Sequence, residues 1–347
     1  MDDKSTSAGE RVDARLRRDR RKLSLALAAA MLATFALGDI MAHSSPVIPN
    51  HVKSEQQRQR DVNGVWLYDA GYLDEADYLL LGQIPNDDYS RGGVYFIGDS
   101  QTAVSLMAWR LPPDERALIH NYGVGALRHR DVYHLVRMLV EDFNLLQAGG
   151  EKTTLVLGIS YYLARPEREG VTLKYYVERH QLYSYDERGM HPAPLNPVER
   201  LAIVERDYVQ RFLATALGAR QSRVTVYLPD QQTAEGRLVD GDWRAAMQRE
   251  LGYLAALLDY LSARSVNVVA FFPPSGSWED AVPYEAAYRE AVMPLLEQRR
   301  VQLVDQGDWL ADADFADGNH PKYLVQLDLH ERNRAIALEA LHAMGLR

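Results

Sequence analysis

A serine, an aspartate and a histidine stand in settings that suit acyl transfer. Ser100 follows an apolar run and a Gly-Asp pair, whereas Asp317 and His320 lie three residues apart in a polar stretch far along the chain. On one loop, a carboxylate can hold the Nδ1–H of an imidazole while the Nε2 atom faces a serine hydroxyl. These residue types therefore predict a nucleophile at Ser100, a base at His320 and an orienting carboxylate at Asp317.

The residues around Ser100 indicate how this side chain is presented. Residues 94–97 are apolar and favour β-structure, and apolar residues with helical spacing follow the serine, so the pattern predicts a strand, a tight turn and a helix. Ligands of open α/β sheets bind beyond the carboxyl ends of the strands, where the first N–H groups of a helix stabilise negative charge. A serine N-cap at an ordinary strand-to-helix turn gives the same local pattern. The distant Asp317 and His320 favour the nucleophile.

Strands and helices are expected to alternate along the rest of the chain. The helices are predicted at residues 243–261, 284–299 and 324–344, and the strands at residues 117–121, 153–158, 223–228, 266–272 and 301–304. This alternation predicts an α/β fold, a three-layer sandwich with a mostly parallel sheet and helices on both faces. Residues 161–221 break the pattern and are interpreted as an insertion. The tyrosines of this insertion either pack a helical cap or form a wall that binds sugar rings.

From about residue 93 onward, the sequence resembles the SGNH (GDSL-like) hydrolase family. The resemblance rests on the block Gly98, Asp99 and Ser100 and on the Asp-x-x-His-Pro block at residues 317–321. It implies that Ser100 is the nucleophile and that His320 acts first as general base and then as general acid. It also implies that Asp317 orients the ring of His320.

In that family, a glycine after the second strand and an asparagine after the third strand help to bind the oxyanion. The resemblance places either Gly123 or Gly125 in the first role, and the sequence does not choose between them, since a tight turn would also use both glycines. Ser160 stands where the family has the asparagine, so a hydroxyl replaces the amide. Because losing one oxyanion donor typically lowers the rate roughly 100-fold to 1000-fold, this position departs from an efficient general esterase.

The composition of the 347 residues excludes several classes of protein. Without cysteine, the chain forms no disulfide, thiolate metal site or cysteine nucleophile. A net charge of -9 argues against general binding to nucleic acid. His120, His129 and His134 have no carboxylate at metal-ligand spacing, and no phosphate-binding or dinucleotide-binding glycine loop is present. We therefore expect neither a metal nor a cofactor.

The N-terminal residues indicate export. Residues 1–22 form a basic leader, and residues 23–42 contain an apolar run. Basic residues before an apolar segment place the N-terminus in the cytoplasm and the following chain outside the inner membrane. Cleavage after Gly38 or Ala42 would release a soluble periplasmic esterase, but the long charged leader favours an uncleaved single-pass anchor in the inner membrane.

A linker and lead-in at residues 43–91 would lift a periplasmic catalytic domain at residues 92–347 off the membrane. This layout resembles the membrane-anchored branch of the family, such as the alginate O-acetylation proteins and the D-alanine transfer protein of teichoic acid synthesis, which partner membrane-bound O-acyltransferases. The hypothesis is an exported serine acyltransferase or acylesterase that modifies an extracytoplasmic polysaccharide, by O-acetylation. The alternative, motivated by Ser160 in place of the asparagine, is a non-catalytic glycan-binding or scaffold subunit.

Overall fold

The computed structural model describes most of the chain after residue 77. The described residues are 78–125, 127–165, 181–186, 189–200, 242–316 and 318–347, together with Lys22, Ser24, Ala33, Ala202, Ile203 and Arg206. Most of the predicted membrane segment, most of the predicted linker and the predicted strand at residues 223–228 lie outside this set. Within the set, no helix combines the length and the apolar composition that crossing a membrane requires.

Five parallel strands form the central sheet. In chain order they are β1 (Gly93–Gly98), β2 (Ile119–Gly123), β3 (Thr153–Gly158), β6 (Asn267–Phe272) and β7 (Gln302–Asp305). Their spatial order is β2-β1-β3-β6-β7, and all neighbouring strands are parallel. The predicted α/β fold with a mostly parallel sheet is confirmed. Because the chain leaves β1 toward one edge of the sheet and β3 toward the other, the carboxyl ends of these two strands flank the switch point where α/β proteins bind ligands.

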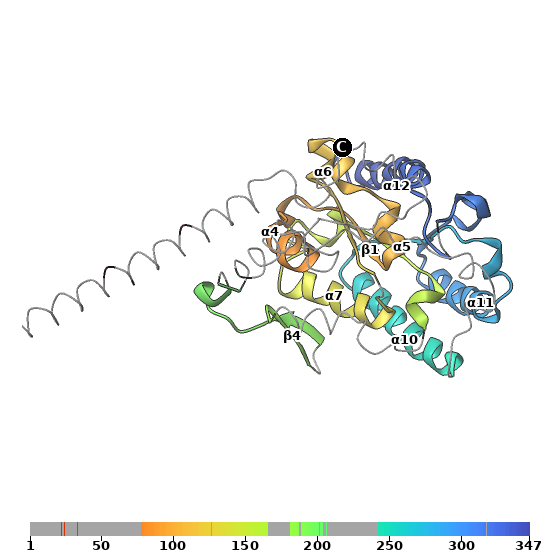
Figure 1. Cartoon of the computed structure of the whole chain (residues 1–347), viewed down its shortest axis with the longest axis horizontal. Coiled ribbons are helices and arrows are strands. Elements are labelled where there is room, and N and C mark those ends of the chain that lie inside the picture. Colours follow the sequence, from red (N-terminus) through yellow and green to blue (C-terminus); the bar gives the residue numbers. More distant parts are fainter. Residues whose placement is uncertain are drawn as a thin grey trace, which may run out of the picture.

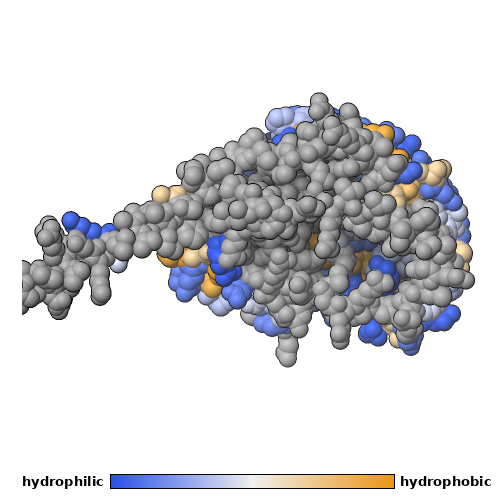
Figure 2. Space-filling model, viewed as in Figure 1, coloured by the Kyte–Doolittle hydropathy of each residue, from blue (hydrophilic) through white to orange (hydrophobic). Residues whose placement is uncertain are grey.

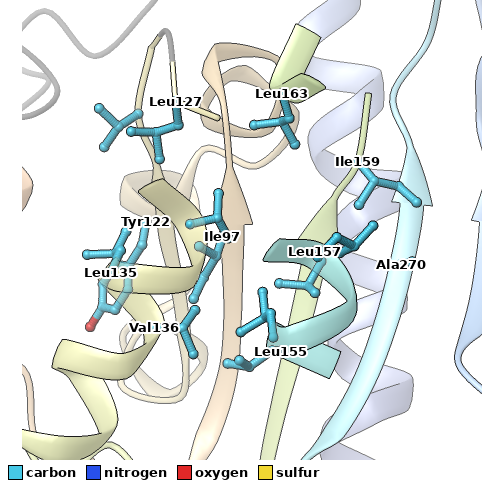
Figure 3. Packing of buried hydrophobic residues seen from close by; sticks show 14 of the residues in the cluster. Ile97, Tyr122, Leu127, Leu135, Val136, Leu155, Leu157, Ile159, Leu163 and Ala270 are labelled. Carbon is cyan, nitrogen blue, oxygen red and sulfur yellow. The ribbon is translucent and has the colours of Figure 1, made fainter. Parts of the chain in front are cut away.

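Three helices cover one face of the sheet (Figure 1). They are α7 (His129–Glu141), α10 (Trp243–Ser262) and α11 (Pro283–Gln298), and their apolar residues belong to the same core as Ile97 of β1. Figure 3 shows part of this core, which includes Ile97 of β1 and Leu135 of α7. The larger hydrophobic core of the protein therefore lies between the sheet and these helices.

The helix α12 (Tyr323–Ala343) packs on the opposite face. Val94 and Phe96 of β1 belong to a second core together with Ala337 and Leu341 of α12. Successive residues of β1 thus serve opposite cores, as the two-residue period of a strand requires. Strands buried on both faces need continuous apolar runs, which is why the sequence shows runs rather than alternation. The arrangement is a three-layer sandwich.

Two predicted element boundaries differ from the structure. The sequence predicts the second strand at residues 117–121, but β2 begins and ends two residues later, because Gly98 of β1 pairs with Gly123 in parallel register. The helix that follows the first strand, α5 (Ser100–Ser105), ends earlier than the apolar spacing indicates, and the 3-10 helix η3 (Ala108–Arg110) follows it.

Short elements connect the layers and build the predicted insertion. The further short helices are η1 (Tyr78–Gln83), α4 (Ile84–Asn86), η2 (Tyr89–Arg91), α6 (Pro113–Arg116), η4 (Gly150–Lys152), η5 (Tyr161–Ala164), η8 (Ser277–Glu279), η9 (Gly307–Trp309) and η10 (Asp312–Asp314), of which η5 begins the predicted insertion. Within the predicted insertion, β4 (Tyr183–Asp186) and β5 (Gly189–Pro192) form an antiparallel pair of their own. In the view of Figure 2, hydrophilic residues dominate the described surface and hydrophobic ones are scattered among them.

The described tyrosines of the insertion are not one exposed wall. Tyr161 is buried and packs against the ring of Tyr284 with 4.7 Å between the ring centroids. Tyr183 is also buried, and its hydroxyl donates to the backbone oxygen of Leu80 at 2.7 Å. These two side chains pack the core, which corrects the sugar-binding interpretation for them. Tyr162 is half-buried.

Glu115 of α6 ties the final helix to the body. Its buried carboxylate accepts hydrogen bonds from Arg334 at 2.6 and 2.7 Å and from Arg347 at 2.6 Å. The hydrogen bonds from Arg334 lower the pKa of Glu115 to about 2, against an ordinary value of 4.5. A lowered carboxyl pKa stabilises the folded state above the unfolded pKa. The stabilisation of the folded state by the Glu115 carboxylate is therefore complete above about pH 4.5 and is lost as the pH falls toward about 2.

We expect Glu115→Gln to lower the free energy of unfolding by about 2 kcal/mol at pH 7, since hydrogen bonds to charged groups are lost. The difference from the wild type should shrink as the pH falls toward 2, which urea unfolding followed by circular dichroism measures. Glu141→Gln is the matched control, because it breaks an exposed pair with Arg137 and should cost less than about 0.5 kcal/mol. Equal losses in both variants would contradict the role of Glu115.

Candidate active site

The structure brings Ser100 and His320 together. The Ser100 Oγ and His320 Nε2 atoms are 2.8 Å apart, within hydrogen-bond distance, although 220 residues separate them in the chain. Ser100 is the first residue of α5, directly beyond the carboxyl end of β1, and is half-buried; His320 is buried in the loop before α12. Asp317 lies outside the described residues, so its orienting role stays a prediction.

Glycines at the ends of three strands let α5 lie directly on the sheet. A Cβ atom on Gly123 of β2 would meet the backbone nitrogen of Ala103 at 2.3 Å. Cβ atoms on Gly98 and Gly158 would meet the hydroxyl of Thr102 at 2.1 and 1.9 Å. Because the glycines leave these strand ends without side chains, the helix that carries Ser100 lies in direct contact with β1, β2 and β3.

The side chain of Asn121 holds the carboxyl end of α5. Its Nδ2 group donates to the backbone oxygens of Thr102, Ala103 and Leu106 at 3.1, 3.1 and 2.7 Å. Its Oδ1 atom accepts the N–H of Gly123 at 2.9 Å. These bonds satisfy the last carbonyls of the helix, which accounts for the early end of α5.

Two polar side chains on the buried face of α12 bind to α5 and the turn after it. Asn333 donates from Nδ2 to the backbone oxygen of Ser105 at 3.2 Å and accepts from Gln306 at 2.9 Å. The backbone N–H of Met107 donates to Nδ1 of His330 at 3.2 Å. Burial lowers the pKa of His330 to about 4, which keeps the ring neutral and able to accept this bond at neutral pH. The helix that follows the His320 loop is thereby fixed to the segment that carries Ser100.

Three side-chain donors hold the loop that carries His320. The indole Nε1–H of Trp278 donates to the backbone oxygen of Gly318 at 2.8 Å. The side-chain amide of Gln101 donates to the oxygen of Asn319 at 3.3 Å, and Gln326 donates in the same way to the oxygen of Pro321 at 2.9 Å. The loop is therefore bound from η8, from α5 and from α12, so the position of His320 depends on all three elements.

Asp99, the residue before the candidate nucleophile, is buried and caps α5. Its Oδ1 atom accepts the N–H of Gln101 at 3.0 Å, and its Oδ2 atom accepts the hydroxyl of Ser160 at 3.0 Å. Burial raises the pKa of Asp99, while the bonds from Ser160 and Gln101 and the charge of His320 act in the opposite direction. Asp99 therefore links the loop after β3 to the first turn of α5.

The predicted oxyanion donors lie in different settings. The N–H of Gly123 is engaged by Asn121, and the hydroxyl proton of Ser160 is engaged by Asp99, so these bonds weigh against both predicted roles. Gly125 lies in the turn after β2. The oxyanion roles of Gly123, Gly125 and Ser160 stay predictions.

The other histidines near β2 have specific partners. His120 places its Nδ1 atom 3.0 Å from a carboxylate oxygen of Asp87. His129 places its Nε2 atom 2.8 Å from the hydroxyl of Tyr288, and burial lowers the pKa of His129 to about 3. In the part of the chain that the structure describes, no three histidine, aspartate or glutamate side chains are grouped so as to hold a metal ion.

Several residues that position the site are not among those predicted from the sequence. Asn121, His330 and Asn333 tether α5, and Trp278 binds the His320 loop. His330 and Asn333 lie three residues apart on α12 and interrupt its apolar face, which is a signal that could have been read. Nothing comparable marks Trp278 in the sequence.

The fold and the site define an α/β protein with a serine-histidine dyad at the switch point of a five-stranded parallel sheet. Among solved structures, the chain is similar to a "putative acylhydrolase" from Bacteroides fragilis NCTC 9343, with 15% sequence identity and a TM-score of 0.39, over 77% of this chain and 99% of that chain. No protein-family model matches the chain, and no curated protein does.

Proposed function

We propose that the protein is a serine acyltransferase or acylesterase of the SGNH type. The observation that carries this proposal is the 2.8 Å separation between Ser100 Oγ and His320 Nε2. A histidine at that distance can accept the serine proton as the oxygen attacks, which converts a weak nucleophile into an effective one. The position of Ser100 beyond β1 leaves its hydroxyl at the edge where ligands of α/β proteins bind.

The proposed reaction has two steps. In the first, His320 Nε2 takes the proton of Ser100 as its Oγ attacks the ester carbonyl carbon; the bond to the leaving alcohol breaks, and that alcohol receives the proton. In the second, an acceptor hydroxyl gives its proton to His320 and attacks the acyl carbon, and Ser100 leaves with the proton restored. Transfer and hydrolysis differ only in whether the acceptor is a glycan or water.

The engaged donors at Gly123 and Ser160 favour a selective enzyme over a general one. One missing oxyanion donor costs roughly 100-fold to 1000-fold in rate. We propose the Ser100 N–H, in the first turn of α5, as an oxyanion donor, and Gly125 stays the second predicted one. Such a site suits one small acyl group that is presented to it, for which acetyl is our proposal.

The setting of the enzyme belongs to the same proposal. The basic leader and the apolar segment support a single-pass anchor in the inner membrane with the catalytic domain in the periplasm. There it would act on an extracytoplasmic polysaccharide, together with a membrane-bound O-acyltransferase that supplies the acyl group. Mass spectrometry of the membrane-extracted protein tests the anchor: recovery of peptides that precede residue 38 is expected, and their absence would mean cleavage.

The alternative is a non-catalytic glycan-binding or scaffold subunit, which the engagement of two predicted oxyanion donors favours. A fluorophosphonate probe, which reacts with activated serines, separates the two functions. We expect the full-length protein to be labelled and Ser100→Ala to be unlabelled. Ser277→Ala is the matched control and should label normally, because the Ser277 hydroxyl donates to a carboxylate of Asp312. An unlabelled wild-type protein would favour the scaffold.

A further inference from the structure

A small hollow lies beside the candidate nucleophile. Its lining includes Gln101, the residue after Ser100, and Ser160, which binds Asp99, the residue before Ser100. It offers about 10 Å³ to the centre of a water-sized group, which is the space that one water molecule or one hydroxyl needs. The hollow therefore has room for a single small polar group beside Gln101, the residue that follows the candidate nucleophile.

Gln101, one of the residues that line this hollow, carries an unsatisfied acceptor. Its side chain is only 5% exposed. Its Nε2 atom must face the Asn319 oxygen, because only the nitrogen can donate to a carbonyl, and the Oε1 atom is left facing away from that bond. This oxygen has no hydrogen-bond partner among the described residues. A buried acceptor without a donor is costly, so a ligand that donates here gains the full value of the bond.

The other polar groups of the hollow also favour a donor. The carboxylates of Glu279 and Glu285 line it, and each accepts a hydrogen bond, from Tyr162 at 2.8 Å and from Arg289 at 2.7 Å. Arg289 is shared between Glu285 and Asp305. A methyl group of the same size would leave the Gln101 oxygen unpaired, and an anion would meet two carboxylates. The chemistry of the lining thus favours a group that donates a hydrogen bond, such as a hydroxyl.

We propose that this hollow is the acceptor subsite of the transfer reaction, where Gln101 Oε1 accepts a hydrogen bond from a hydroxyl that neighbours the attacking one. This inference rests on the proposed acyl transfer at Ser100. The ligand class is an alcohol with hydroxyls on adjacent carbons, as in a sugar ring. Water fits the same hollow, so an empty subsite leaves the acyl-enzyme open to hydrolysis, whereas a bound diol directs the acyl group to transfer.

Competition between two acceptors for one acyl-enzyme tests the subsite. The full-length protein in a hydroxyl-free detergent is acetylated with p-nitrophenyl acetate in the presence of ethylene glycol and its monomethyl ether. The two alcohols share similar intrinsic reactivity, but only the glycol has a second hydroxyl. We expect the acetylated products, counted per attacking hydroxyl, to favour the glycol about fivefold, the typical effect of one neutral hydrogen bond. Because both acceptors react with the same intermediate, this ratio does not depend on the rate of acylation.

Three variants separate the subsite from a purely structural effect. Gln101→Met should bring the ratio close to one, whereas Gln101→Glu, which keeps an acceptor oxygen but loses the donor to Asn319, should keep the preference. Gln326→Met is the matched control, because Gln326 also donates to the His320 loop but does not line the hollow; its ratio should equal that of the wild type.

The outcomes distinguish this inference from the function on which it rests. A ratio near one in the wild type, with acetylated Ser100 detected by mass spectrometry, would overturn the subsite and leave the acyl transfer intact. An unchanged ratio in Gln101→Met would overturn it as well. If no acetylated Ser100 forms under any condition, both the proposed function and the subsite fall.

Discussion

Replacing His320 with alanine is expected to lower the rate of Ser100 acylation by about 10⁴-fold or more. The reason is that the Ser100 hydroxyl loses the group 2.8 Å away that takes its proton, and removal of one member of such a unit costs nearly as much as removal of all. Release of nitrophenol from p-nitrophenyl acetate measures the rate, and Ser100→Ala should lose a similar factor.

His342→Ala is the control for His320→Ala. His342 lies exposed in the last turn of α12, on the same helix that follows the His320 loop. The acylation rate of the His342→Ala variant should stay within a factor of about two of the wild-type rate, since surface substitutions away from special features are nearly neutral. If His320→Ala retained the wild-type rate, another group would have to be the base.

Gly123→Ala should reduce the acylation rate about 100-fold without touching either member of the dyad. The new methyl group would lie 2.3 Å from the backbone nitrogen of Ala103 and 2.7 Å from its Cα atom. Backbone cannot give way as the end of a flexible side chain can, so α5 must move and carry Ser100 with it. A displacement of about 1 Å at a reacting group can cost about 100-fold in rate, and overpacking lowers stability by about 2 kcal/mol.

The matched control for this substitution is Gly252→Ala. Gly252 lies exposed in α10, and a Cβ atom there would have no neighbour within 4 Å. This change should raise the free energy of unfolding by roughly 0.5–1 kcal/mol, as alanine usually does in a helix, and leave the rate unchanged. Thermal unfolding and the ester assay report the two quantities. Full activity in Gly123→Ala would show that α5 tolerates the shift.

The meeting of Ser100 and His320 could be expected from the sequence for a simple reason. The local sequence around each residue predicts its position in the fold. Ser100 directly follows an apolar strand pattern, and His320 lies in a polar stretch before a long helical pattern. In a parallel sheet the strand ends that carry such residues share one edge. Local patterns therefore sufficed to place the dyad.

The tethers around the dyad could not be read in the same way. Asn121 binds backbone oxygens of α5 and of the residue after it, which are 15 to 19 residues away, and Asn333 binds an oxygen of α5 that is 228 residues away. Which carbonyl an amide reaches depends on packing, and packing leaves no period in the sequence. The same is true of Ser160, whose residue type permits an oxyanion donor but whose neighbour Asp99 takes its proton.

Aromatic residues show a related limit. The sequence places Tyr161 and Tyr162 side by side, and both can stack on sugars or pack a core. In the structure Tyr161 is 3% exposed, whereas Tyr162 is half-buried and lines the hollow beside Gln101. Two adjacent tyrosines therefore differ in burial, and the amino-acid composition of the segment does not predict which of them packs into the core.

The dyad joins residues that are made at very different times. A chain emerges from synthesis with its N-terminal part first, so Ser100 is present long before His320, which lies 220 residues later. Until α12 packs against α5, the serine has no base and reacts no faster than an ordinary alcohol. A partly made chain therefore does not react with esters around it, and the serine becomes reactive only when the last helix docks.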